Sequence, residues 1–345
     1  MLNNIKYKSL FSMAFATVAL SLSVSSHAFA AKPDVTLRVY STLNATPDSS
    51  THVFFDKFQT LVKEKYGDRI KFNYFPNGIL GKEADAIQQL RSGAIDITLT
   101  GVSIWSTIVP VMGVLDQGYL YQNFDEVGKF LDQKPGQYLA DRLLKQGNAI
   151  TLGWGYSLGA RNIYTIKPVT KMGDLAGKKI RVLPVTGFIN TINKMGAVAI
   201  PMPLGEVYSG LQMGVVDGVE HDNSTVLMNK YYEVAKYAYE SEHIFNPMVF
   251  TINKASFARI PADMQAGVLE AAKEATEYER SQAMIIDAHD KSELQKKGMK
   301  FTAVDKSAMK TTMQPLWNAF FSENKDLVFM LDYIKNGSAV AVDKK

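Results

Sequence analysis

One arginine in this sequence is well suited to binding an organic acid. Arg181 lies in a short apolar run that follows the turn sequence Asp174-Leu175-Ala176-Gly177. A guanidinium keeps its charge and offers a planar pair of N–H groups that matches a carboxylate. The apolar neighbours indicate a buried strand, so the charge of Arg181 needs an anionic partner. That partner is either a ligand or a structural acid such as Asp217 or Glu220, and the residues alone leave both open.

A second segment combines a titratable ring, an acid and an amide. His221-Asp222-Asn223 follows a short apolar run. The three residues can form a capped turn, a pair of side chains that face a ligand, or part of a metal site. The sequence has five His, no Cys, no His pair at metal-binding spacing and no glycine cluster for phosphates or dinucleotides. We therefore expect no metal and no cofactor.

Residues 155–159 match a sequence pattern found around the nucleophilic serine of hydrolases. Gly155-Tyr156-Ser157-Leu158-Gly159 fits G-x-S-x-G, in which a strand precedes the serine and a helix follows it directly. Here residues 160–168 are rich in β-branched side chains and end at a proline, which favours a strand. A glycine-flanked crossing between two lobes is the favoured interpretation. A periplasmic serine hydrolase using Ser157 remains the alternative.

The N-terminus indicates export. Lys6 and Lys8 precede a largely apolar run over residues 10–24, and Ala28-Phe29-Ala30 supplies a small-residue cleavage site. This pattern is typical of a signal peptide over residues 1–30, cleaved after Ala30, and predicts a periplasmic location. An uncleaved anchor is the alternative. With 38 basic and 34 acidic residues and no long run of one sign, nucleic acid is not an expected partner. We expect the mature protein to be a soluble monomer.

The elements that must position these residues alternate between strand and helix. Strand patterns and helix patterns follow one another over residues 35–100 and again over residues 161–220, and residues 261–297 favour one long helix. We expect an α/β, two-lobe periplasmic binding protein fold with a multi-strand hinge and a long interlobe helix. The expected limits are residues 31–156 plus about 244–285 for lobe I, and residues 157–243 plus about 286–345 for lobe II.

Several motifs occur in an order that resembles one family. Gly177-Lys178-Lys179-Ile180-Arg181 is followed by the run over residues 205–220, and the first lobe contains Phe75-Pro76-Asn77-Gly78 and Gly93-Ala94-Ile95-Asp96. Over about residues 35–300 the chain resembles the solute receptors of tripartite ATP-independent periplasmic (TRAP) transporters, the DctP-like family. The resemblance implies a receptor without enzymatic activity. It would bind an organic acid between its lobes and deliver it to a sodium-coupled permease of two subunits.

The resemblance also implies roles for individual residues. It makes Arg181 the main bidentate contact to the ligand carboxylate and Arg161 a second contact, for which a hinge salt bridge is the alternative. It assigns packing on the ligand to Leu204. It places Thr100 and Trp105 on the opposite wall, with Trp105 as a stacking surface, and Asn44 in the first loop above the same cleft.

One departure from the family bears on the ligand. The family commonly has Asn, often followed by Pro, where this chain has His221 and Asp222. An acid at this place favours hydroxyl groups and repels a second carboxylate. We therefore expect a monocarboxylate with hydroxyl or ring substituents. A receptor for an ATP-driven importer or a sensor shares the fold logic and remains an alternative.

Overall fold

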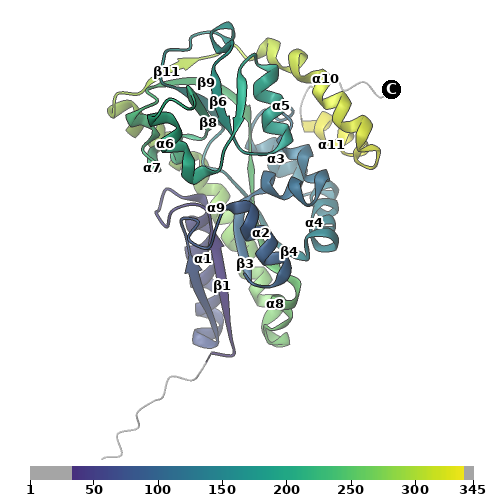
Figure 1. Ribbon diagram of the computed structural model, residues 1–345. Helices are drawn as coiled ribbons and strands as arrows, with labels where there is room; N and C mark the ends of the chain where they lie inside the picture. Colours follow the sequence, from purple (N-terminus) through teal and green to yellow (C-terminus); the bar gives the residue numbers. More distant parts are fainter. Residues whose placement is uncertain (1–32, 338–345) are drawn as a thin grey trace, which may run out of the picture. The chain divides into compact units, whose positions relative to one another are not determined.

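The computed structural model describes residues 33–337, and the expected signal peptide with its cleavage site lies outside them. The strands form two separate mixed sheets (Figure 1). The sheet that contains the first strand is called sheet one here, and the other is called sheet two. Among the described residues no helix is long and apolar enough to span a membrane.

Sheet one has the strand order β2-β1-β3-β10-β4. Its strands β1, β2 and β3 are parallel, whereas β10 runs antiparallel to both β3 and β4. The bounds are Val35–Ser41 for β1, Ile70–Phe75 for β2, Ile97–Gly101 for β3, Ala149–Tyr156 for β4 and Pro247–Asn253 for β10. Apolar side chains of β1, β3 and β10 pack against the first helix, where Phe54 stacks on Phe250 with ring centroids 3.8 Å apart.

Sheet two has the strand order β11-β9-β5-β8-β6-β7. In it β6 is parallel to β7 and β8, while β5 is antiparallel to β8 and β9. The bounds are Arg161–Thr165 for β5, Lys179–Val182 for β6, Val198–Pro201 for β7, Gly218–His221 for β8, Tyr237–Ile244 for β9 and Lys300–Ala303 for β11.

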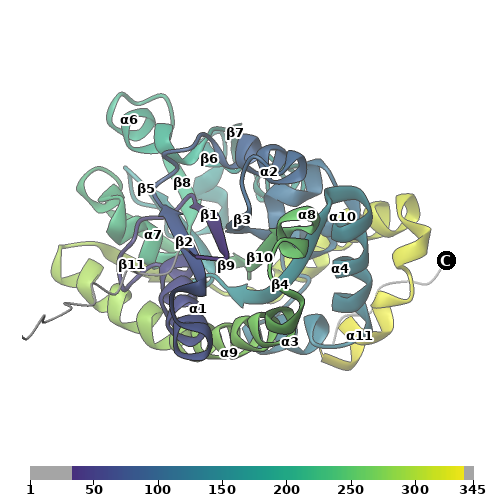
Figure 2. The same ribbon diagram turned by 90° about the horizontal axis from the view of Figure 1, so that it is seen from below.

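Helices cover both sheets. The bounds are Ser50–Tyr66 for α1, Glu83–Ser92 for α2, Phe124–Leu131 for α3, Lys134–Gly147 for α4, Thr186–Lys194 for α5, Val207–Gln212 for α6, Asn223–Met228 for α7, Lys254–Ala258 for α8, Ala262–Lys296 for α9, Ser307–Glu323 for α10 and Met330–Gly337 for α11. Figure 2 shows α1 and α9 side by side, in agreement with their contacts. Helices α3 and α4 follow each other closely: α3 ends at Leu131, and α4 begins at Lys134 with Pro135 in its first turn.

Three segments connect the sheets. The chain passes from β4 to β5 and returns from β9 to β10, and the 35-residue α9 contacts β4 and α1 as well as α7. The predicted two-lobe α/β fold with a multi-strand hinge and a long interlobe helix is therefore confirmed. Strand β4 lies very close to α9: a Cβ atom at Gly153 would lie 2.0 Å from Thr276 Oγ1, and one at Gly155 would lie 2.6 Å from Glu279 Oε2. Glycine is required at both positions.

Candidate functional site

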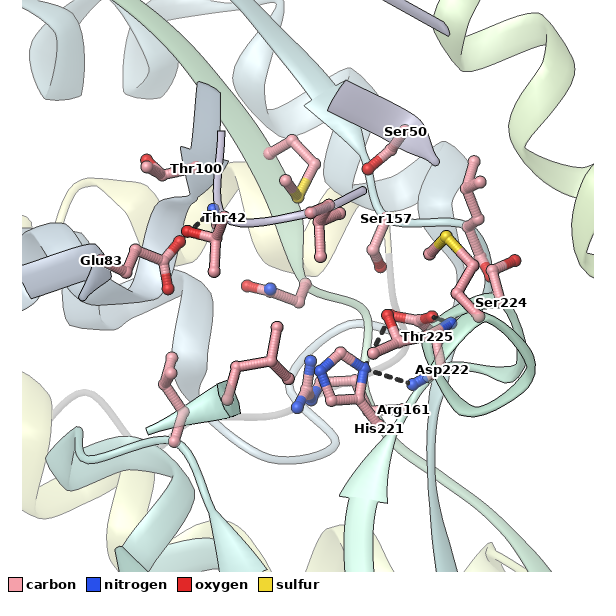
Figure 3. A pocket seen from close by; sticks show the side chains of 18 of the residues that line it. Thr42, Ser50, Glu83, Thr100, Ser157, Arg161, His221, Asp222, Ser224 and Thr225 are labelled. Carbon is pink, nitrogen blue, oxygen red and sulfur yellow. Dashed lines mark hydrogen bonds and ion pairs between the residues drawn. The ribbon is translucent and has the colours of Figure 1, made fainter. Parts of the chain in front are cut away.

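A cavity lies where strands of both sheets end. It spans about 630 Å³ of space not filled by atoms, part of which is open to solvent. The lining comes from the ends of β3, β6 and β8, the crossings β4–β5 and β9–β10, and the N-terminus of α2. Polar lining residues, most of which are labelled in Figure 3, are Thr42, Ser50, Glu83, Thr100, Ser157, Arg161, Arg181, His221, Asp222, Ser224, Thr225 and Asn246.

Arg181 lines this cavity, and among the described residues it forms no ion pair with an acid. Its side chain is 1% exposed, and its Nε and Nη2 donate to the carbonyl of Met202 at 2.9 and 2.6 Å. The remaining nitrogen, Nη1, is buried and makes no hydrogen bond within residues 33–337. Burial lowers the pKa of this guanidinium below its usual value. A structural salt bridge to Asp217 or Glu220, one of the two alternatives, is not formed.

Arg161 has the opposite environment. Its Nε and Nη2 donate to Glu220 Oε2 and Oε1 at 2.5 and 2.9 Å, and the guanidinium stacks on Phe188, 4.9 Å from the ring centroid. Burial acts to lower the pKa of Arg161, but the Glu220 carboxylate holds it above the usual value. Burial also acts on Glu220, yet Arg161 and His243 lower its pKa to about 2. Arg161 therefore forms the hinge salt bridge, and it lines the cavity as well.

The turn after β8 both caps a helix and faces the cavity. Asp222 Oδ1 accepts from the Thr225 N–H at 2.7 Å at the start of α7, and its Oδ2 lies 3.0 Å from His221 Nδ1. Burial, aided by Arg161, lowers the pKa of His221. Burial acts to raise the pKa of Asp222, but His221 and Arg161 hold it low. In the described chain no group of His, Asp and Glu is placed to hold a metal ion.

Glu83 is a cavity residue that sequence reasoning missed. It is the first residue of α2, half-buried, and its Oε1 accepts from the Gly101 N–H at 3.1 Å. Burial raises its pKa to about 7, although Gly101, Arg181 and Arg161 act to lower it. Figure 3 shows Glu83 on the opposite side of the cavity from Arg161 and His221. An acid in the first turn of a helix is common for electrostatic reasons, so the sequence carried no signal for this role.

The other predicted residues divide into two groups. Leu204 and Thr100 line the cavity. Asn44 instead lines an adjoining, larger hollow, which shares Leu204 and Glu83 with the cavity. The expectation that Trp105 offers a stacking surface is wrong: its ring is fully buried in the hydrophobic core, and its indole N–H donates to Thr100 Oγ1 at 3.1 Å.

Ser157 does not have the surroundings of a nucleophile. Its hydroxyl donates to the carbonyl of Gly159 at 3.0 Å, and no hydrogen bond joins it to a His within the described residues. The segment after it is the strand β5, whereas a nucleophile elbow requires a helix there. The structure therefore does not support the hydrolase alternative.

A buried polar chain leads away from the cavity. Asn246, which lines the cavity and was not predicted, accepts through Oδ1 from Ser103 Oγ at 2.7 Å. The same hydroxyl is hydrogen bonded to Asp116 Oδ1. Both Ser103 and Asp116 are fully buried, and Asp116 Oδ2 has no hydrogen-bond partner in the described chain. Burial raises the pKa of Asp116 to about 7, although Ser103 and Arg161 act to lower it.

Residues 41–324 match the family model DctP, "Bacterial extracellular solute-binding protein, family 7". The chain belongs to this family. A solute-binding protein of Chromohalobacter salexigens is 32% identical over 286 residues, which cover 82% of this chain and 84% of that protein. The 2,3-diketo-L-gulonate-binding periplasmic protein YiaO of Escherichia coli is 32% identical over 232 residues, covering 67% and 70% of the two chains.

Solved structures agree with the family model. A TRAP periplasmic solute-binding protein from Chromohalobacter salexigens with bound D-glucuronate superposes with a TM-score of 0.83 at 30% identity, covering 88% of this chain and 100% of that one. One from Sulfitobacter sp. NAS-14.1 with bound β-D-galacturonate has a TM-score of 0.82 at 27% identity, with the same coverage. The predicted membership of the TRAP receptors is confirmed. Family 7 members are substrate-binding receptors located outside the cytoplasm, and TRAP receptors act with membrane permease subunits.

Proposed function

We propose that this TRAP receptor binds a polyhydroxylated monocarboxylate, a sugar acid, in the cavity between its lobes. The observation that carries the proposal is the buried Nη1 of Arg181, which has no hydrogen-bond partner in the described chain and belongs to a residue that lines the cavity. A buried donor of this kind is costly unless an acceptor reaches it. A ligand carboxylate supplies that acceptor together with the missing negative charge.

The charges of the lining favour one carboxylate over two. Arg161 and Arg181 are the permanent cations among the residues that line the cavity, and Arg161 is already bound by Glu220. A second ligand carboxylate would meet Asp222 or Glu83 without a free cation. Hydroxyl groups suit this wall better, because carboxylate oxygens accept hydrogen bonds from them.

The relatives point to the same ligand class. The two solved structures contain bound D-glucuronate and β-D-galacturonate, and YiaO is named for 2,3-diketo-L-gulonate. Each of these ligands carries one carboxylate and several oxygen substituents. In this proposal Arg181 binds the carboxylate, His221, Asp222 and Thr100 contact hydroxyl groups, Leu204 packs on the ring, and Asn44 lies at the entrance. Arg161 reaches the ligand with the part of its guanidinium that Glu220 leaves free.

Closure of two lobes is part of the proposal. We propose that residues 31–156 with about 244–285 move as one lobe, and residues 157–243 with about 286–345 as the other, after cleavage behind Ala30. The protein then delivers its ligand to the permease without chemical turnover. Small-angle scattering should show a smaller radius of gyration when ligand is added. An unchanged profile at saturating ligand would contradict closure.

Isothermal titration calorimetry tests the ligand class. D-glucuronate, D-galacturonate and 2,3-diketo-L-gulonate are the sugar acids to compare, with succinate and malate as dicarboxylate controls. We expect at least one sugar acid to bind more tightly than both dicarboxylates. Tighter binding of succinate or malate than of every sugar acid tested would overturn the proposal. Asp222→Asn should narrow the difference between the two ligand classes, because it removes the charge that repels a second carboxylate.

A further inference from the structure

The polar chain behind the cavity has a defined hydrogen-bond direction. Ser103 Oγ carries one hydrogen but contacts two oxygen atoms, Asn246 Oδ1 at 2.7 Å and Asp116 Oδ1. If Ser103 donates to Asn246, it must accept from Asp116, and a carboxyl group donates only when it is protonated. If Asp116 were ionised, Ser103 would donate to it, and the Asn246 amide would have to turn by half a rotation.

We propose that Asp116 carries a proton and donates to Ser103, so that Ser103 donates to Asn246 and the amide N–H groups of Asn246 are presented to the ligand. Asp116 is then a positioning residue that acts through Ser103. This inference rests on the proposed function, because it assigns a donor to the same cavity. Within residues 33–337 no protein acceptor takes a hydrogen bond from Asn246 Nδ2.

The surroundings of Asp116 favour the protonated form. Its side chain is fully buried, and no cation lies within ion-pair distance in the described chain. Arg161 is the cation whose charge acts on Asp116, and that charge is bound by Glu220. The other neighbours bring no charge: Tyr121 has a buried hydroxyl without a partner among the described residues, and α5 approaches through Gly187. An ionised carboxylate without a counter-ion is strongly disfavoured in such a place.

The protonation state of Asp116 decides whether Asn246 presents a hydrogen-bond donor or an acceptor to the ligand. With a protonated Asp116, Asn246 presents a donor that complements a ligand carboxylate or hydroxyl oxygen. With an ionised Asp116, the turned amide presents its carbonyl oxygen, which repels a carboxylate. Burial raises the pKa of Asp116 to about 7, so a rise of pH through neutrality removes the proton and with it the donor. Affinity for a sugar acid should therefore fall as the pH rises.

The first experiment needs no ligand. Protein labelled with 13C at aspartate is titrated by NMR, and the carboxyl signal of Asp116 is identified as the one missing from the Asp116→Asn variant. A midpoint near or above pH 7 supports the proposal. A signal that is already ionised at pH 5 overturns it, whatever the protein binds.

The second experiment measures D-glucuronate binding at pH 6 and pH 8. In the unaltered protein the affinity should fall about tenfold through Asp116, as expected for a group that titrates near 7. Asp116→Asn keeps a donor towards Ser103, so its affinity at pH 6 should stay within about threefold of the parent, and this tenfold response should vanish. Ser103→Ala removes the hydroxyl that links Asp116 to Asn246. This variant should bind D-glucuronate more weakly, and its affinity should also lose the dependence on pH.

Asp125→Asn, at an exposed position of α3, is the matched control and should keep the parent's response. Any contribution of Glu83 is common to all of these variants and cancels in the comparison. Parallel pH profiles for the parent and Asp116→Asn would overturn the proposal, as would a loss of more than tenfold in Asp116→Asn at pH 6. If the parent binds no sugar acid at all, the proposed function fails while the NMR titration still decides the state of Asp116.

Discussion

Two buried arginines line the same cavity and are balanced in different ways. The charge of Arg161 is paired with Glu220 within the fold. Arg181 makes hydrogen bonds to one carbonyl and has no counter-ion in the described chain. The first arrangement fits a structural joint at the hinge. The second keeps a cation available at the cost of lower stability without ligand. The comparison teaches that burial of an arginine does not by itself indicate its role, and that its partner does.

The largest expected effect comes from breaking the balanced pair. Glu220→Gln leaves the Arg161 charge buried without an anion, which typically costs about 3–5 kcal/mol. The free energy of unfolding, measured with urea, should fall by about that amount. Arg181→Met is the matched comparison, since it removes a buried charge that has no anion, and it should leave the stability unchanged or higher. Equal losses in both variants would remove the distinction between the two arginines.

For ligand affinity, in contrast to stability, the larger effect should come from changing Arg181. Arg181→Lys keeps a charge but loses the planar pair of donors, and we expect affinity for the sugar acid to weaken by about 2–4 kcal/mol. Calorimetry measures the change. Lys179→Arg, at an exposed position of the same strand, is the control and should change affinity less than threefold. An Arg181→Lys variant with parental affinity would mean that another group anchors the ligand.

The buried acids Glu279 and Glu220 differ in the same way as the two arginines, and this difference makes the stability of the fold depend on pH. Burial raises the pKa of Glu279 to about 8, and its Oε1 has no partner in the described chain. The folded state therefore holds a proton that the unfolded chain, with a glutamate pKa of about 4.3, releases. Stability should fall as the pH rises from about 4 to about 8. The low pKa of Glu220 acts in the opposite direction, and its contribution is lost as the pH falls from about 4 towards 2.

Scanning calorimetry between pH 4 and pH 9 measures this slope. Glu279→Gln should make the slope smaller, because each unit of pKa shift that is removed corresponds to about 1.4 kcal/mol, while Asp116 and Glu83 keep their own contributions. A Glu279→Gln variant with the same slope as the parent would show that Glu279 is ionised in the folded state.

The smallest expected effect lies at the entrance. Lys82 Nζ and Glu206 Oε1 lie 3.1 Å apart, both exposed, at the start of α2 and in the segment before α6. Such a pair contributes about 0–1 kcal/mol and is screened by salt. Lys82→Gln should raise the ligand dissociation rate by about threefold or less, and the difference from the parent should shrink at high salt in stopped-flow measurements. A double-mutant cycle with Glu206→Gln isolates the pair, and a coupling energy of zero would exclude a role in holding the lobes together.

The sequence predicted the fold, and the position of Arg181 at the cavity, better than the rest of the site. Alternation of strand and helix patterns is local, so the α/β class and the long α9 could be predicted from it. The partner of Arg161 depends on β5 and β8 being antiparallel neighbours, which brings residues 59 positions apart into contact. Trp105 was misplaced because a 3-10 helix directly after β3 turns its ring into the core. Asp116 and Asn246 were missed because their contact with Ser103 is tertiary and has no local signature.

The close contact between β4 and α9 has a mechanical consequence. Because a methyl group at Gly153 would collide with Thr276 and one at Gly155 with Glu279 and Phe250, strand and helix are closely packed, and we expect them to move together as one rigid body. A pair of spin labels across this contact should therefore give the same distance with and without ligand, while a pair on α2 and β7 should report the change. Since the 345-residue sequence contains no Cys, labels attached to two introduced thiols would occupy those positions alone, and the rigid pair would serve as an internal length standard.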